Sequence, residues 1–211
     1  MKKRIFITAT NTNIGKTYTT KLLLREFAKK GLRVGALKPI ESGVEDGLAQ
    51  DALELLTLTK ELNSELSDFE LKDITPYMFN LAAAPFVAGK GVSVEVIKEA
   101  LIKLEEHCDI VFIEGAGGLY VPIERDYFMI DLIKDLDAKA LLVTHCSLGC
   151  INDTLLSQKA LQAKNIEYIV AFNCKDELDF KTISKPYFDE VGFDVLEVKK
   201  DIVNICEILY N

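Results

Sequence analysis

The chain has 211 residues, with 25 Lys and Arg against 33 Asp and Glu, which gives a formal net charge of −8. At roughly 150 residues per domain, this length fits one large domain or two small ones. Hydrophobic residues make up 49% and charged residues 27%, which excludes the disordered and low-complexity classes. The acidic balance argues against general binding of nucleic-acid backbones, which depends on clustered cations.

The chain contains no apolar run long enough for a transmembrane helix or a signal peptide. Its basic opening, Lys2 to Arg4, is followed by only a short apolar run. The cysteines show neither zinc spacing nor a secreted disulfide framework. We therefore expect a cytoplasmic protein whose cysteines are free thiols. The five cysteines are Cys108, Cys146, Cys150, Cys174 and Cys206.

Short β-rich runs alternate with amphipathic stretches along the chain, which indicates parallel βαβ units. The predicted strands are Arg4–Ala9, Arg33–Lys38, Asp109–Glu114, Ala140–His145, Tyr168–Asn173 and Phe193–Val198. The predicted helices are Thr17–Lys30, Asp51–Leu62, Val94–Glu106, Ile130–Leu136, Asp153–Lys164, Phe180–Glu190 and Ile202–Leu209. We predict an α/β fold with one doubly wound, mostly parallel sheet flanked by helices, forming a single domain over residues 1–211. Ser64 to Gly91 is too long for an ordinary connection, so we expect a functional segment or an inserted helix with loops.

The segment Thr10–Thr17 directly follows the first predicted strand and opens the first predicted helix. Consecutive backbone N–H groups there can surround a polyphosphate, with the positive end of the helix behind them. Lys16 would reach the β- and γ-phosphates, and the Thr17 hydroxyl would bind Mg²⁺. A polar turn with a solvated lysine is the alternative, but the strand–loop–helix context favours a phosphate site. The loop is longer than the common form, since Ala9, not residue 10, supplies the first small side chain.

Two further polar motifs follow predicted strands. Glu114 ends one strand and leads into Gly115–Gly118, and an acid at that point would face the ligand crevice of an α/β fold. Lys38 to Gly43 follows the second strand and offers a cation for an anion and the Ser42 hydroxyl for a polar substrate. A surface acid and an exposed turn lysine are the respective alternatives. Asp51, taken alone, fits a helix N-cap better than a ligand.

Together these motifs resemble the dethiobiotin synthetase family, in the same order and with similar spacing from residue 4 to about residue 175. Leu148–Asn152 and Asn173 complete the resemblance. It implies a fold of the P-loop NTPase type and a Mg²⁺-dependent ligase of biotin biosynthesis. That enzyme carboxylates 7,8-diaminopelargonate with CO2 and closes the ring to dethiobiotin at the expense of ATP, through a carbamate and a carbamic–phosphoric anhydride. Family members are homodimers, and nucleic acid and membranes are not expected as partners.

The resemblance also implies roles for individual residues. The nucleotide contacts would be Asn13, Ile14, Gly15, Lys16, Thr17, Tyr18, Asp51, Glu114, Gly115, Ala116, Gly117, Asn173 and Cys174. The metal ligands would be Thr17, Asp51 and Glu114, and the catalytic lysines would be Lys16 and Lys38. The substrate contacts would be Thr12, Lys38, Ser42 and Gly118, together with Leu148, Gly149, Cys150, Ile151 and Asn152 at a helix start that acts across the dimer.

Several positions depart from the family pattern. Asn13 stands where the family has an acid, and Phe86 stands where it has a histidine. The part after Asn173 lacks the proline-containing loop that helps to hold the base. We therefore predict weak nucleotide affinity or relaxed choice between ATP and other triphosphates.

A ParA/MinD-like switch ATPase is the main alternative function, since it shares the sheet and the phosphate loop. That class carries an additional lysine early in the loop, but Thr10 to Thr12 contain none. A basic amphipathic membrane helix at the C-terminus is also not evident. A nucleotide-binding half of an amidotransferase-type ligase would need a glutaminase domain, for which we expect no room.

Overall fold

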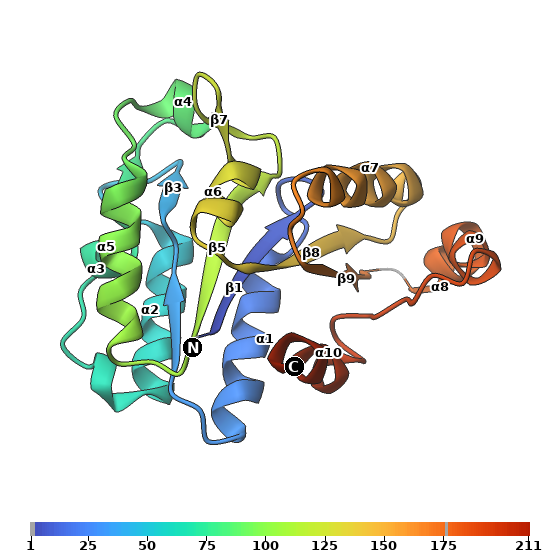
Figure 1. The fold of residues 1–211 in the computed structure, drawn as a ribbon, viewed down its shortest axis with the longest axis horizontal. Helices are drawn as coiled ribbons and strands as arrows, with labels where there is room; N and C mark the ends of the chain where they lie inside the picture. Colours follow the sequence, from blue (N-terminus) through green and yellow to red (C-terminus); the bar gives the residue numbers. More distant parts are fainter. Residues whose placement is uncertain (1–2, 176) are drawn as a thin grey trace.

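The computed structural model describes residues 3–175 and 177–211. Its centre is a five-stranded sheet in the order β2-β5-β1-β8-β9, in which every neighbouring pair is parallel (Figure 1). The strands are β1 (Lys3–Ala9), β2 (Val34–Leu37), β5 (Ile110–Gly118), β8 (Lys139–His145) and β9 (Tyr168–Asn173). The predicted α/β fold with a parallel sheet is therefore confirmed, and the carboxyl ends of all five strands meet at one edge.

The strands alternate their side chains between two buried faces. Ile5 and Ile7 of β1 pack on one face, while Phe6 packs on the other. The first face is covered by α1 (Lys16–Lys29) and α10 (Ile202–Tyr210), which lie side by side in Figure 1. The second face is covered by α5 (Val94–Glu105), α6 (Met129–Asp135) and α7 (Cys150–Ala163), while α2 (Gln50–Leu62) contributes to both cores. Apolar runs covered on both faces explain why these strands could be recognised from the sequence.

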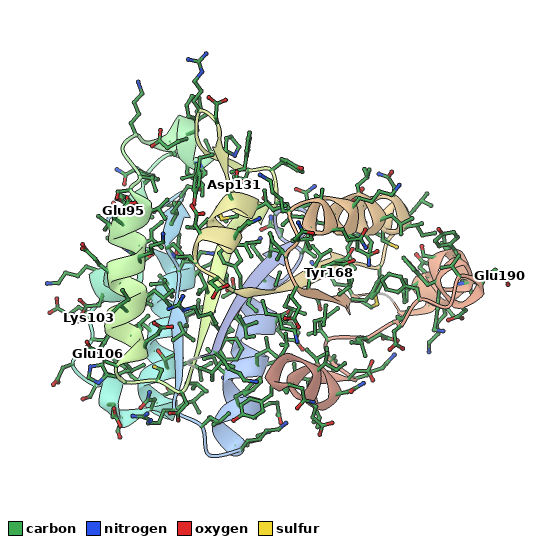
Figure 2. The ribbon with its side chains drawn as sticks, in the orientation of Figure 1. Glu95, Lys103, Glu106, Asp131, Tyr168 and Glu190 are labelled. Atoms are coloured by element: carbon green, nitrogen blue, oxygen red, sulfur yellow. A yellow bond between two sulfur atoms is a disulfide. The ribbon has the colours of Figure 1, made fainter. Side chains whose placement is uncertain are left out.

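The helix α5 shows how the outer layer is patterned. Glu95, Lys103 and Glu106 are exposed along its outer side, as Figure 2 shows. Ile97 and Leu101 point inward and are buried against the sheet. This spacing is that of an amphipathic helix.

Residues 64–91 form short elements instead of one inserted helix. They comprise η1 (Ser64–Leu66), α3 (Leu71–Ile74), β4 (Tyr77–Phe79) and α4 (Pro85–Ala88). β4 pairs in parallel with β3 (Ile40–Ser42), which directly follows Lys38. A separate antiparallel pair consists of β6 (Pro122–Glu124) and β7 (Tyr127–Phe128). The pairing of β3 with β4 brings residues 82–85 beside the carboxyl edge of the sheet.

The predicted strand Phe193–Val198 is wrong. Only Glu197 forms a bridge with Phe172, flanked by hydrogen bonds between Phe172 and residues 196 and 198. The ring of Phe193 packs 5.0 Å from that of Phe188 and 6.1 Å from that of Phe172. This aromatic cluster draws the segment away from the sheet edge, so the pairing does not extend.

The predicted helix Phe180–Glu190 is interrupted. The chain forms α8 (Glu177–Asp179), a π-helical turn η2 (Phe180–Ser184) and then α9 (Lys185–Glu190), which has a proline in its first turn. Pro186 has no N–H to donate, so regular α-helical hydrogen bonding cannot continue through it.

The expectation of free thiols is wrong for two of the cysteines. Cys146 and Cys174 form a disulfide, whereas Cys108, Cys150 and Cys206 are buried and lie outside any disulfide. The pairing of His145 with Asn173 places the two following cysteines at adjacent strand ends, with Cα atoms 4.9 Å apart. Sequence spacing could not reveal this contact, because it depends on the strand order. Within residues 3–175 and 177–211, no helix is long and apolar enough to cross a membrane.

Candidate functional site

The loop between β1 and α1 forms the floor of the site. Asn13 and Gly15 adopt positive φ angles of 59° and 103°, which turn the backbone around the helix start. Asn173 at the end of β9 donates its side-chain N–H to the carbonyl of Ile14 at 2.7 Å. The loop is thus held by its hydrogen bond to β9, and it presents Lys16 and Thr17 at the start of α1.

A charge cluster lies beside this loop. The Nζ of Lys38 donates to Glu114 Oε1 at 2.7 Å and to Asp51 Oδ2 at 3.2 Å. Glu114 also accepts hydrogen bonds from the hydroxyl groups of Thr17 and Thr20, at 2.8 and 2.9 Å. Glu114 is completely buried, and these three donors satisfy its carboxylate oxygens. The sequence pattern placed Glu114 at the end of its strand. In the structure β5 continues through Gly118, so Glu114 lies within the strand.

The two lysines of the site differ in their electrostatics. Burial and, to a lesser extent, the nearby charge of Lys38 lower the pKa of Lys16 to about 8. Burial also acts to lower the pKa of Lys38, but the carboxylates of Glu114 and Asp51 outweigh it, and the pKa is raised. Lys38 therefore keeps its charge inside the protein, while Lys16 is a cation that a bound anion would stabilise.

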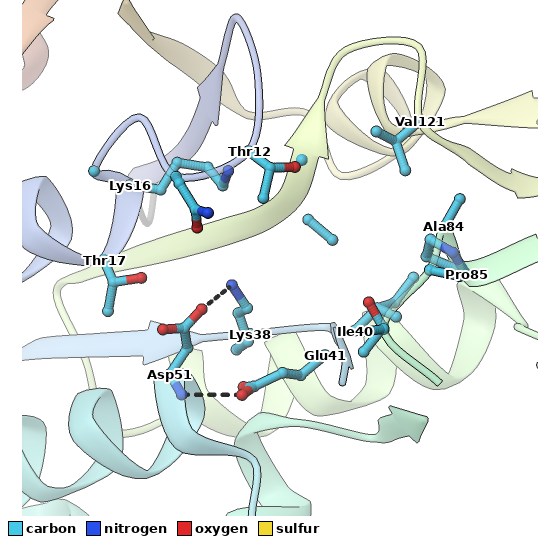
Figure 3. A pocket seen from close by; sticks show the side chains of 17 residues that line it. Thr12, Lys16, Thr17, Lys38, Ile40, Glu41, Asp51, Ala84, Pro85 and Val121 are labelled. Carbon is cyan, nitrogen blue, oxygen red and sulfur yellow. Dashed lines mark hydrogen bonds and ion pairs between the residues drawn. The ribbon is translucent and has the colours of Figure 1, made fainter. Parts of the chain in front are cut away.

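A pocket of about 550 Å³ opens between the loop and β3 (Figure 3). It receives residues from five separate segments that meet at the carboxyl edge of the sheet. Loop and α1 residues form one side, and residues after β2 and at the start of α2 form another. Small residues before and at the start of α4 form a third side, opposite Lys16. The lining residues are Thr12, Asn13, Gly15, Lys16, Thr17, Lys38, Ile40, Glu41, Ser42, Asp51, Ala82, Ala83, Ala84, Pro85, Ala116, Gly117 and Val121.

The donor set fits a magnesium ion bound together with a nucleotide. Within the described residues, no group of three or more His, Cys, Asp or Glu side chains could hold a metal by itself. Thr17 and Asp51 line this pocket, and hydrogen bonds through Thr17 and Lys38 connect them to the carboxylate of Glu114, which is buried behind the lining. Magnesium prefers oxygen ligands and is held by one or two carboxylates plus substrate phosphates.

A second pocket of about 490 Å³ lies on the other side of the loop. His145 connects its walls, since Nδ1 lies 2.6 Å from Ser147 Oγ and Nε2 lies 3.0 Å from Asp153 Oδ2. The position beside Asn173 suits the base and sugar of a nucleotide whose phosphates occupy the loop. The lining residues are Asn11, Thr12, Asn13, Ile14, His145, Cys146, Ser147, Asp153, Asn173, Lys175 and Asp179.

Some of the residues expected at the site lie elsewhere. Tyr18 is 42% exposed on α1 and lines neither pocket. Gly115 packs against Phe6 and Met129 in the core, and Gly118 lies against the backbone of Ala9 and Thr10.

None of the residues 148–152 of the predicted helix start lines the first pocket. Leu148 is 83% exposed, whereas Cys150 is buried and donates its backbone N–H to the carbonyl of Ser147.

Part of the first pocket is lined by residues to which the sequence motifs assigned no role. Glu41 lies in the Lys38–Gly43 motif, in which the sequence suggested roles for Lys38 and Ser42 but not for Glu41. Ala82 to Pro85 form a wall, and their run of small residues before a proline was the available signal. Val121 carried no recognisable signal.

Comparisons with known proteins agree with this geometry. A family model described as an AAA domain (AAA_26) matches residues 3–201. The ATP-dependent dethiobiotin synthetase BioD of Sulfurovum sp. is 47% identical over 89% of this chain and 90% of its own length. The protein of the same name from Wolinella succinogenes is 39% identical over 98% of both chains.

Solved structures show the same fold at low sequence identity. MinD of Aquifex aeolicus has a TM-score of 0.54 at 15% identity, covering 97% of this chain and 86% of its own. A plasmid partition protein from Borrelia burgdorferi has a TM-score of 0.59 at 13% identity, covering 99% of this chain and 96% of its own. These likenesses concern the fold alone, whereas the sequence relatives decide the family. The chain belongs to the dethiobiotin synthetase family.

Proposed function

We propose that this protein is an ATP-dependent dethiobiotin synthetase, a ligase of biotin biosynthesis that converts 7,8-diaminopelargonate, CO2 and ATP into dethiobiotin, ADP and phosphate. The observation that carries the proposal is the pair of lysines at one pocket, Lys16 from the phosphate loop and Lys38 buried between Glu114 and Asp51. A reaction that brings a carbamate anion to a triphosphate needs cations on both reactants.

The chemistry proceeds in three steps. One amine of the substrate attacks CO2, which gives a carbamate and releases a proton. A carbamate oxygen attacks the γ-phosphorus while the bond to ADP breaks. The second amine then attacks the carbamate carbon, loses a proton and expels phosphate as the ring closes.

The residues of the first pocket can serve these steps. Lys16 would balance the β- and γ-phosphate charge, and Lys38 would balance the carbamate. Thr12 and Ser42 offer hydroxyl groups from two separate segments of the pocket lining, which would suit the nitrogen end of the substrate. Magnesium, when bound, supplies further positive charge at the phosphates, and Thr17, Asp51 and Glu114 would hold it.

The second pocket would hold the nucleotide base. Asn173 stands at its edge, but its N–H is already donated to Ile14. We therefore propose that Asn173 supports the loop and that Cys174 fixes the strand end through its disulfide. Because the Asn173 amide N–H is engaged by Ile14, it does not read a base edge, which supports the expectation of relaxed choice among nucleoside triphosphates.

We also propose that the protein acts as a homodimer. Leu148 and Leu156 are 83% and 59% exposed at the start and on the side of α7, which suits contact with a second copy. In the dimer, the partner subunit's Leu148–Asn152 segment would receive the carboxylate end of the substrate. Light scattering should give twice the monomer mass, and Leu148→Asp should give a monomer with a raised KM for the diamine.

The proposed reaction is tested by phosphate release with Mg·ATP and bicarbonate, with and without 7,8-diaminopelargonate. We expect release that depends on the diamine, and a product with the mass of dethiobiotin. Hydrolysis that ignores the diamine would contradict the proposal and favour a switch ATPase.

A further inference from the structure

Glu41 makes a contact that connects β3 to the first turn of α2. Its Oε1 accepts the backbone N–H of Asp51 at 3.0 Å, and its Oε2 accepts that of Ala52 at 2.8 Å. The helix has Ala49 at its N-cap, and no side chain of its own caps it. A carboxylate from another element therefore takes the place of a local cap, at the end of the helix that favours negative charge.

The contact is set inside the protein and at the pocket. Glu41 is only 8% exposed and lines the pocket between Ile40 and Ser42. Burial raises the pKa of Glu41, while the two N–H donors and Lys38 act in the opposite direction. A buried carboxylate satisfied by two backbone donors has a defined orientation, which an exposed cap would lack.

Asp51 is the residue whose position depends on this contact. Its backbone is held by Glu41, and its carboxylate lies 3.2 Å from Lys38 Nζ, as the dashed lines in Figure 3 show. The side chain of Asp51 is 46% exposed, so packing alone does not fix it. Its direction follows from the placement of the helix start.

We propose that Glu41 is a positioning residue that holds the start of α2 so that Asp51 faces Lys38 and the phosphate site. The inference rests on the proposed function, in which Asp51 is a ligand of magnesium bound with the nucleotide. Residues that orient a metal ligand change metal affinity by roughly 10–100-fold when they are removed. Direct contact with the diamine is the competing role for Glu41, since it lines the same pocket.

The test measures the Mg²⁺ dependence of binding of a fluorescent ATP analogue, which requires no diamine and no turnover. We expect Glu41→Ala to raise the half-saturating Mg²⁺ concentration by about tenfold. Glu41→Gln, which keeps one acceptor oxygen, should raise it less. In the Asp51→Asn background, Glu41→Ala should have no further effect, because both changes remove the same carboxylate from the site.

Ser93→Ala is the matched control. Ser93 caps α5 through a hydrogen bond from the N–H of Glu95, away from the pocket. The Ser93→Ala variant should lower thermal stability to an extent similar to that of Glu41→Ala, and it should leave the Mg²⁺ dependence of analogue binding unchanged. Glu41→Ala protein that is folded by circular dichroism but has a normal Mg²⁺ dependence would overturn the proposal. An effect that persists in full in the Asp51→Asn background would do the same.

Failure of the proposed reaction and failure of the positioning role give different results. If the unmodified protein makes no dethiobiotin while Glu41→Ala still shifts the Mg²⁺ dependence, the positioning role holds and the proposed reaction fails. If Glu41→Ala raises only the KM for the diamine, the reaction holds and Glu41 contacts the substrate instead.

Discussion

Lys38 and Glu114 form an ion pair with 2.7 Å between Nζ and Oε1, in which the side chains are 4% and 0% exposed. Lys38 directly follows β2, and Glu114 lies in the neighbouring strand β5, at the edge where the phosphate loop begins. Removing one member of a buried pair leaves the other charge without compensation, which costs more than the pair contributes. Function and stability are therefore coupled at this point.

Glu114→Ala should abolish dethiobiotin formation and lower the free energy of unfolding by about 3–5 kcal/mol. The variant leaves Lys38 buried, with the half-exposed Asp51 as its remaining ion-pair partner among the described residues. Asp51→Asn is the matched control, because it removes the exposed partner and should change stability by less than about 1 kcal/mol. Urea denaturation measures both, and equal losses in the two variants would contradict this account of the cluster.

Nucleotide affinity should fall as the pH rises through about 8, the pKa that burial and Lys38 give to Lys16. Below that pH the Lys16 ammonium is charged and attracts phosphate, and above it the charge is lost. The Kd for ATP without Mg²⁺ should therefore rise about tenfold between pH 7 and pH 9, following the protonated fraction. Lys16→Arg stays charged and should remove the pH dependence, so an unchanged profile in that variant would refute the assignment to Lys16.

Gly15→Ala should disrupt the loop for two reasons. Gly15 has a φ of 103°, and a Cβ there would collide with the side-chain amide of Asn173. We expect a loss of about 1–3 kcal/mol in stability and a large loss of nucleotide affinity. Gly31→Ala is the control, since Gly31 has a φ of 81° with open space around it. It should lose stability alone, and reduced nucleotide affinity in both variants would mean that the collision is unimportant.

Local motifs revealed those parts of the fold and the site that follow directly from strand ends. Lys16, Lys38 and Glu114 could be placed together because the carboxyl ends of parallel strands share one edge. The strands themselves were recognisable because both faces of the sheet are buried.

Contacts between distant segments could not be predicted in this way. Asn173 and Ile14 are 159 positions apart, and their hydrogen bond depends on the strand order. The contact of Glu41 with the start of α2 depends on the path of the chain after β3, which no periodicity encodes. The segment around Glu197 was misassigned because an alternating apolar pattern also suits an aromatic cluster beside the sheet.

The protein should accept several nucleoside triphosphates with similar KM values. The second pocket contains no phenylalanine or tyrosine among its described lining residues, so a base would gain little from stacking. The amide N–H of Asn173 is already engaged by Ile14, which leaves it unable to read a base edge through that donor. Steady-state comparison of ATP, GTP and CTP measures this directly. Exclusive use of ATP with a micromolar KM would contradict the prediction.

Reduction of the Cys146–Cys174 disulfide should destabilise the protein. The bond joins residues 28 positions apart and links the ends of β8 and β9 beside the second pocket. Closing a loop of this length stabilises by about 3–4 kcal/mol through the unfolded chain. A reducing compartment would open the bond, so the oxidised and reduced proteins should differ in stability at the base side of the nucleotide site.

Urea unfolding with and without dithiothreitol measures the difference. The double variant Cys146→Ala, Cys174→Ala should be insensitive to the reductant and should match the reduced protein. Thiol titration of the unfolded, unreduced protein should find the three cysteines outside the disulfide, Cys108, Cys150 and Cys206. Reaction of all five cysteines would show that the bond does not form, and the original expectation of free thiols would then stand.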